Sequence, residues 1–247
     1  MSSPGRKPVV VIACDVLQDM LVNLLPDGLA DEVTFFDFAM HVTPRKMVQT
    51  LQDAIDSIEE SSLVVLGYGL CGNGLNGIKA GQHTLLLPRV DDCIAMILGS
   101  REAYRKEFEK EPGTYYLSKG WLEANNRRID QPEEGVSPYG VDPLAAYELY
   151  VSQYGPETAK CLMDKQYQNY KRLALVAHGQ ADLEECRPRA QEVARYCQQW
   201  GMRYEEILGS DAYVRRLVVV ATTPQMADGD FLLIPPGGEI RQVQFTS

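Results

Sequence analysis

Residues 63–77 read LVVLGYGLCGNGLNG, an apolar run that leads directly into a glycine-rich loop. A short apolar run bounded by glycine is typical of a strand that is buried on both faces. Five of the eleven residues from Gly67 to Gly77 are glycine, which allows positive φ angles and lets a ligand approach the backbone closely. Cys71 lies inside this loop, where backbone N–H groups could stabilise a thiolate or an anionic ligand.

The same arrangement recurs along the first hundred residues. The apolar runs at 9–12 and 85–87 lead to Cys14 and Cys93, and a predicted strand at 33–40 leads to His41. Helical segments are expected between the runs, so strands and helices alternate. This alternation predicts an α/β fold with a parallel sheet and right-handed crossovers, in which ligands bind outside the carboxyl ends of the strands. We therefore expect the three cysteines and His41 to point at one edge of the sheet.

Three cysteines and one histidine are a ligand set for tetrahedral zinc. The predicted metal ligands are Cys14, His41, Cys71 and Cys93. Zn²⁺ is the first expectation, and a [4Fe-4S] cluster held by three thiolates is the alternative. Thiolates exclude Mg²⁺ and Ca²⁺ as natural occupants. Four protein ligands would close the site and favour a structural role, whereas three would leave a position open to substrate.

Further roles are predicted for the neighbours of these cysteines. Cys71, Cys93 and Asp92 are the candidate catalytic groups, with Asp92 acting as a general base or simply as a helix cap. A helix N-terminus at Cys93 would lower the pKa of its thiol. The loop supplies the candidate cofactor-binding residues, which are Gly69, Gly72, Asn73 and Gly74. No helix N-terminus with a ribose-reading acid is evident after the loop, and the loop lacks the Gly-Lys-Ser/Thr of a Walker A motif, so a nucleotide site finds little support. The alternative is a tight structural loop with a buried cysteine.

The rest of the chain is expected to form two further parts. Nine of the thirteen tyrosines fall between Tyr104 and Tyr170, where helical patterns and a loop near 125–139 are predicted. Strands are predicted again at 172–177, 203–207 and 231–234. The expected parts are an N-terminal α/β half (1–100), a mainly helical, tyrosine-rich insertion or cover (101–170) and a C-terminal α/β half (171–247). The remaining cysteines, Cys161, Cys186 and Cys197, follow helical patterns and are expected in the core. His178 follows a predicted strand and is a secondary site candidate.

The bulk composition limits the partners. The chain has 34 acidic and 24 basic residues and a formal net charge of −10, which argues against nucleic acid and anionic membranes. No apolar stretch approaches the roughly 20 residues that span a bilayer, and no signal peptide is recognised. The six cysteines are dispersed and form no CxxC pair, as expected for a reduced, cytoplasmic compartment. Homo-oligomerisation is left open.

Several motifs resemble those of the DUF1638 family of bacterial and archaeal proteins. They include Tyr68-Gly69-Leu70-Cys71-Gly72, Asp91-Asp92-Cys93-Ile94 and the closing Pro235-Pro236-Gly237-Gly238. The resemblance also takes in Cys14 and His41 with their neighbours, and it extends over nearly the whole chain. Members of this family often lie beside corrinoid-dependent methyltransferases that act on methylated amines. The resemblance therefore implies a setting in one-carbon, methyl-transfer metabolism, and it carries over no catalytic residues.

Three functions are compatible with these observations. In the first, the protein binds zinc or an iron–sulfur cluster and activates a small-molecule substrate at an open metal position. In the second, it is a non-enzymatic accessory protein that docks a corrinoid protein or its methyltransferase through an acidic, tyrosine-rich face. In the third, Cys71 or Cys93 is a nucleophile that works without metal.

Overall fold

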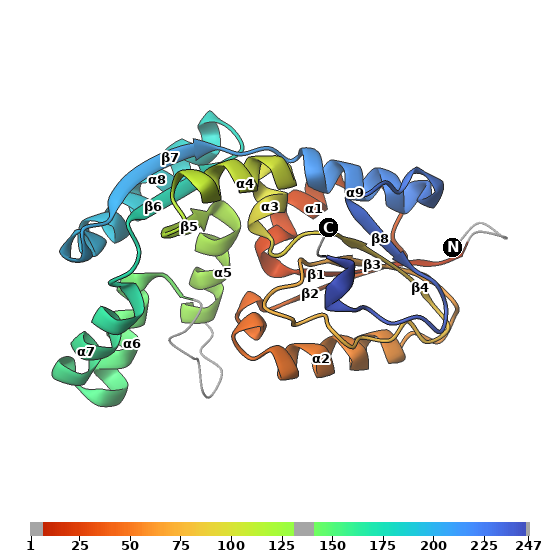
Figure 1. Ribbon diagram of the computed structural model, residues 1–247, viewed down its shortest axis with the longest axis horizontal. Helices are drawn as coiled ribbons and strands as arrows, with labels where there is room; N and C mark the ends of the chain where they lie inside the picture. The colour runs from red at the N-terminus through yellow and green to blue at the C-terminus, as the bar shows by residue number, and fades with distance from the viewer. Residues whose placement is uncertain (1–6, 131–140, 246–247) are drawn as a thin grey trace. The chain divides into compact units, whose positions relative to one another are not determined.

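The computed structural model describes residues 7–130 and 141–245. These residues form two compact units (Figure 1). Unit 1 contains the described residues up to 101 and those from 211 onward, and unit 2 contains residues 102–210. The contacts thus divide the chain differently from the three parts expected at residues 100 and 170. Residues 171–210 join the tyrosine-rich segment, whereas 211–245 return to the N-terminal part. No helix among the described residues is long and apolar enough to cross a bilayer.

Unit 1 is built on a five-stranded sheet with the order β2-β1-β3-β4-β8. Its strands are β1 (Val9–Cys14), β2 (Glu32–Phe36), β3 (Leu63–Gly67), β4 (Thr84–Pro88) and β8 (Phe231–Ile234). The first four are parallel, and β8 pairs antiparallel with β4. All residues of β1 and β3 are buried, as expected for strands covered on both faces. The α/β class with mostly parallel sheets is confirmed, and β8 makes this sheet a mixed one.

Helices cover both faces of this sheet. Helix α2 lies on one face, and α1 and α9 lie on the other (Figure 1). Helix α9, supplied by the last part of the chain, packs against α1 and α3. The helices of unit 1 are η1 (Asp15–Leu17), α1 (Gln18–Leu24), η2 (Phe38–Val42), α2 (Pro44–Asp56), α3 (Ile94–Leu98), α9 (Ala212–Thr222), η4 (Pro224–Met226) and η5 (Gln242–Gln244).

Unit 2 contains a three-stranded parallel sheet with the order β5-β6-β7. Its strands are β5 (Thr114–Ser118), β6 (Arg172–Ala177) and β7 (Arg203–Leu208), and its helices are α4 (Arg101–Lys110), α5 (Lys119–Asp130), α6 (Pro143–Tyr154), α7 (Pro156–Tyr167), α8 (Gln180–Cys197) and η3 (Gln198–Trp200). The expected loop near 125–139 is helical up to Asp130, and residues 131–140 lie outside the described residues.

The tyrosines of unit 2 serve mainly its own core. Tyr167 is buried, and its ring lies 5.8 Å from that of Tyr115 and 5.2 Å from that of Trp200, measured between ring centroids. Tyr115 comes from β5, a strand that the helical patterns of this segment did not predict. Packing of these rings accounts for part of their concentration in this segment, and the docking role stays a prediction.

Candidate functional site

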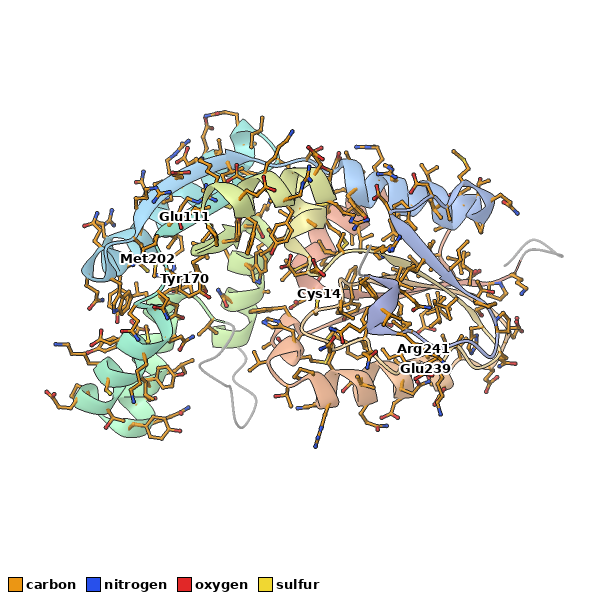
Figure 2. All side chains as sticks on the ribbon, viewed as in Figure 1. Cys14, Glu111, Tyr170, Met202, Glu239 and Arg241 are labelled. Atoms are coloured by element: carbon orange, nitrogen blue, oxygen red, sulfur yellow. The ribbon has the colours of Figure 1, made fainter. Side chains whose placement is uncertain are left out.

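The three predicted cysteines lie at the carboxyl end of the unit 1 sheet. Cys14 is the last residue of β1 (Figure 2), Cys71 follows β3, and Cys93 directly precedes α3 after β4. Strands β1, β3 and β4 are neighbours in the sheet, so their carboxyl ends lie side by side. The chain moves from β1 to β2 on one side and then to β3 on the other side of β1. This reversal creates the crevice in which open α/β sheets bind ligands.

The glycine-rich loop is hydrogen-bonded to the segment that follows β4. The N–H groups of Leu70 and Cys71 donate to the carbonyls of Val90 and Asp91, at 2.9 and 2.8 Å. Gly69 packs closely against the backbone of Asp92. A β-carbon added to Gly69 would lie 2.7 Å from the Cα atom of Asp92. These contacts bring the loop that carries Cys71 onto the segment that carries Cys93.

The backbone of this loop adopts unusual conformations. Cys71 and Asn73 have positive φ angles of 48° and 73°, and they are the two non-glycine residues with positive φ in the described part of the chain. Gly72, between them, has a φ of 61°. Residues held in the left-handed region cost stability and cluster at functional sites. Gly72 and Asn73 are exposed, whereas Gly74 is buried and lies against Met47 of α2.

Burial and nearby charges raise the pKa values of all three thiols. Burial, and to a lesser extent the charge of Asp92, raise the pKa of Cys71 to about 12. Burial, nearby aspartates and the other thiols raise the pKa values of Cys14 and Cys93 well above the usual range. The backbone N–H groups of Gly69 and Cys93 hydrogen-bond the sulfur of Cys71 and lower its pKa, but burial has the larger effect. The pKa lowering expected for Cys93 from a helix N-terminus is therefore wrong, because burial outweighs it.

Three carboxylates act electrostatically on the thiols. Asp15 Oδ1 accepts from the N–H of Phe38 at 2.9 Å and lies 3.9 Å from the sulfur of Cys14. Asp92 Oδ1 accepts from the N–H of Ile94 at 2.9 Å, but the N-cap of α3 is Cys93 and not Asp92, the residue considered for that role. The charged side chains with the largest effects on the three thiols are Asp15, Asp37 and Asp92. The site is therefore suited to a positively charged occupant.

His41 does not follow a strand as predicted. Strand β2 ends at Phe36, because Asp37 caps a short 3-10 helix by accepting from the N–H of Ala39 at 2.7 Å. His41 is an exposed residue of this helix, and its Nδ1 is hydrogen-bonded with the carbonyl of Phe38. Its role as a metal ligand stays a prediction.

Sequence reasoning missed Tyr68 as a site residue. It directly follows β3 and is 2% exposed, and its hydroxyl has no hydrogen-bond partner among the described residues. Burial raises its pKa, and Cys14 and Cys71 are the next largest causes. Its place in the motif with Cys71 was the available signal, but a tyrosine after an apolar strand is typical of a core residue.

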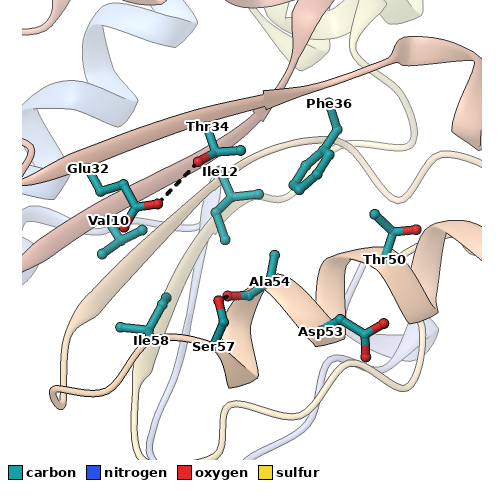
Figure 3. A pocket seen from close by; sticks show the side chains of 10 residues that line it. All are labelled: Val10, Ile12, Glu32, Thr34, Phe36, Thr50, Asp53, Ala54, Ser57 and Ile58. Carbon is teal, nitrogen blue, oxygen red and sulfur yellow. Dashed lines mark hydrogen bonds between the residues drawn. The ribbon is translucent and has the colours of Figure 1, made fainter.

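The remaining candidates lie elsewhere. Cys186 and Cys197 are buried in α8 as expected, whereas the core placement expected for Cys161 is wrong, since it is exposed on α7. His178 follows β6 in unit 2. A groove of about 440 Å³ lies between β1, β2 and α2 (Figure 3), and none of the three site cysteines lines it.

The thiols do not form a finished metal cage. Among residues 7–130 and 141–245, no group of three or more histidine, cysteine, aspartate or glutamate side chains is arranged so that it could hold a metal ion. Soft donors and acidic neighbours fit a thiophilic cation chemically.

The raised thiol pKa values predict how stability depends on pH. The folded protein retains these protons longer than the unfolded chain, so stability falls as pH rises above the unfolded thiol pKa, from about 8.5 toward the folded value. The free energy of unfolding of metal-free wild type should fall more steeply than that of Cys71→Ser, by up to about 1.4 kcal/mol per pH unit. Denaturant unfolding between pH 8 and 10 measures the difference. Equal slopes would contradict the burial of the Cys71 thiol.

Comparison with known proteins gives one match. The family model described as "Protein of unknown function (DUF1638)" matches residues 35–218. This range includes Tyr68, Cys71 and Cys93, and Cys14 lies outside it. No curated protein and no solved structure matches the chain. The matched region covers more than half of the sequence, so the chain belongs to the DUF1638 family.

Proposed function

We propose that this protein binds a thiophilic metal ion through the thiolates of Cys14, Cys71 and Cys93. Zn²⁺ is the proposed ion, and a [4Fe-4S] cluster on the same three cysteines is the alternative. The observation that carries the proposal is the placement of three cysteines at the ends of three neighbouring strands beside the reversal of strand order. Ligands bind at this position in open α/β sheets.

The charge of the surroundings supports a cation. The charge of Cys71 disfavours ionisation of Cys14 and Cys93, and Asp15, Asp37 and Asp92 act in the same direction. A divalent ion reverses this effect, because it attracts the thiolates and displaces their protons. Thiolate sulfur selects zinc or iron over the hard cations Mg²⁺ and Ca²⁺.

The same electrostatics disfavour a nucleophile that works without metal. At pH 7, a thiol with a pKa of about 12 is ionised in only about one molecule in 10⁵. The thiolate is the reactive form of cysteine, so a metal-free Cys71 would be a poor nucleophile. A cation that holds the thiolates removes this difficulty.

Three cysteine ligands leave one position of a tetrahedral ion open. We propose that this position accepts a small-molecule substrate, which the ion activates as a Lewis acid. Its setting would be the corrinoid-linked methyl-transfer metabolism that family resemblance implies. Asp92, the residue before Cys93, would then act as a general base through its carboxylate. In the accessory alternative, the same metal site would stabilise a protein that docks a corrinoid protein.

Metal analysis of the native protein tests the proposal. The protein is purified without oxygen and without an affinity tag that binds metal, and its zinc, iron and acid-labile sulfide are measured. We expect about one zinc ion per chain, or about four irons per chain with matching sulfide if the cluster is present. Amounts well below stoichiometric, which added Zn²⁺ fails to restore, would contradict the proposal.

A further inference from the structure

Strand β2 forms one edge of the unit 1 sheet. It is the first strand in the order β2-β1-β3-β4-β8, so one of its sides has no strand partner among the described residues. Glu32 and Val33 are exposed, with 39% of Val33 accessible, and the other three residues of the strand are half-buried. The edge is therefore open to solvent.

The residues of β2 lack the usual protection of an open edge. Exposed edge strands commonly carry lysine, proline or several charges, because an unprotected edge pairs with a strand of another chain. The residues Glu32–Phe36 read EVTFF, in which the single charge is followed by β-branched and aromatic residues that favour strands. In contrast, β7, an edge strand of unit 2, carries Arg203, Glu205 and Glu206. The composition of β2 thus favours pairing.

The hydrogen bonds of the sheet indicate which backbone groups of β2 point to the open side. The N–H of Leu63 on β3 donates to the carbonyl of Pro8 at 2.8 Å. Since backbone groups alternate in direction along a strand, the even-numbered residues of β1 bond β3 and the odd-numbered ones bond β2. Val11 therefore bonds β2, and because its register partner is Val33, its bonds go to the residues before and after Val33. The N–H and C=O groups of Val33 and Phe35 consequently point to the open side.

We propose that β2 pairs antiparallel with the β2 strand of a second copy of this chain, about a two-fold axis that passes beside Thr34. The two unit 1 sheets then form one continuous sheet across an isologous interface. Val33 exchanges both of its open hydrogen bonds with the partner's Phe35, and Thr34 lies directly opposite the partner's Thr34. In this register every residue of β2 has an opposite residue in the partner strand.

The side chains of β2 are complementary to themselves in this register. Val33 opposite the partner's Phe35 is a pair of a β-branched and an aromatic residue, and two opposite threonines are also a favourable pair. Glu32 lies opposite the partner's Phe36, at the end of the interface. The two Glu32 carboxylates are therefore at opposite ends, where their repulsion is weak.

The charges of α2 fit the same arrangement. Lys46, Thr50 and Asp53 are separated by four and three residues, so they share one face of the helix. Thr50 and Asp53 line the groove beside β2 (Figure 3), so this face is turned toward the edge strand. Helix α2 runs from the carboxyl end of β2 to the amino end of β3, and Lys46 lies in its first turn. The two-fold axis thus brings the Lys46 end of α2 opposite the end that carries the partner's Asp53, and these charges attract.

The test measures the mass of the full chain in solution by light scattering and sedimentation. Reducing conditions prevent the exposed Cys161 from linking two copies. The variants are Thr34→Lys, Thr34→Glu and Val33→Pro. The matched control is Thr223→Lys, which adds the same charge at an exposed position directly after α9.

We expect wild type to be a dimer that dissociates on dilution. Thr34→Lys and Thr34→Glu should each raise the dissociation constant about 100-fold or more, because like charges then lie directly opposite each other. A mixture of these two variants should form a dimer again, since the introduced charges are then opposite in sign. Thr223→Lys should associate as wild type does.

Val33→Pro tests the backbone hydrogen bonds. Proline removes the N–H of Val33, which points to the open side, so the bonds between β2 and β1 are retained. We expect dimerisation to weaken about tenfold or more. The circular dichroism spectrum should stay that of wild type, which shows that the chain still folds.

Three results would overturn the inference. The first is a wild type that stays monomeric up to about 100 μM. The second is a dimer that Thr34→Lys and Val33→Pro leave intact, and if one of these variants does not fold, the other decides. The third is a mixture of Thr34→Lys and Thr34→Glu that stays monomeric. None of these measurements depends on the proposed metal site, so each proposal stands or fails separately.

Discussion

Replacing Gly69 with alanine should lower the free energy of unfolding by about 3 kcal/mol. Gly69 is buried, and an added β-carbon would lie 2.7 Å from the Cα and carbonyl carbon of Asp92 and 2.8 Å from its nitrogen. All three are backbone atoms, so relief requires the loop and the segment after β4 to separate. That movement would also break the 2.8 Å hydrogen bond from the N–H of Cys71 to the carbonyl of Asp91.

Gly229→Ala is the matched control for this measurement. Gly229 also belongs to unit 1, its φ is outside the left-handed region, and a β-carbon there would meet no atom within 4 Å. We expect its free energy of unfolding to stay within about 0.5 kcal/mol of wild type. Denaturant unfolding of the metal-free proteins measures both variants. A Gly69→Ala protein as stable as Gly229→Ala would contradict the tight contact between the two loops.

Much of unit 1 could be predicted from local patterns. The apolar runs at 9–12, 63–66 and 85–87 lie within strands β1, β3 and β4, and the predicted strand at 231–234 is β8. A strand that is buried on both faces is apolar throughout, so it can be recognised in the sequence as a continuous apolar run. The order of the strands has no such local signal. The return of residues 211–245 to unit 1 depends on contacts with α1, α3 and β4, which no sequence periodicity predicts.

Two errors in the predicted strands have identifiable physical causes. Residues 33–40 were predicted as one strand because Phe35, Phe36 and Phe38 are apolar and aromatic. The strand ends at Phe36, since the side chain of Asp37 satisfies the N–H of Ala39 and starts a 3-10 helix. The second error is β5, whose residues Thr114–Ser118 lie between helices and include two tyrosines. Their role as a strand is decided by pairing with β6.

The cysteines of the site could be located from the sequence, because each follows a recognisable strand. Tyr68 could not, since its unusual feature is a missing hydrogen bond in the folded state. The raised pKa values of the thiols could not be predicted from the sequence either. A helix N-terminus is visible in a sequence, but the burial that outweighs it depends on how the loops after β3 and β4 pack together.

Cys71→Ser should reduce the affinity for Zn²⁺ by about 100-fold or more, because even residues that only support metal ligands contribute about 10- to 100-fold. Cys71 is the thiol that acts on both of the others, and the N–H groups of Gly69 and Cys93 hydrogen-bond its sulfur. Serine has nearly the same shape as cysteine. The hydrogen bond from the N–H of Cys71 to the carbonyl of Asp91 is formed by backbone atoms, so the substitution retains it. The loop should therefore keep its conformation while losing a thiolate. Competition with a chromophoric chelator under anaerobic conditions measures the affinity.

Cys161→Ser separates a specific ligand from a general effect of losing one cysteine. Cys161 is an exposed cysteine of α7 in unit 2, so its thiol is free to bind zinc nonspecifically but belongs to no cluster of thiols at a sheet edge. We expect its zinc affinity to equal that of wild type. If Cys71→Ser and Cys161→Ser lose affinity equally, or if neither loses any, the zinc is not held where strands β1, β3 and β4 end. The loss should also occur in Cys14→Ser and Cys93→Ser, because an ion shared by three thiolates is weakened by removing any one of them.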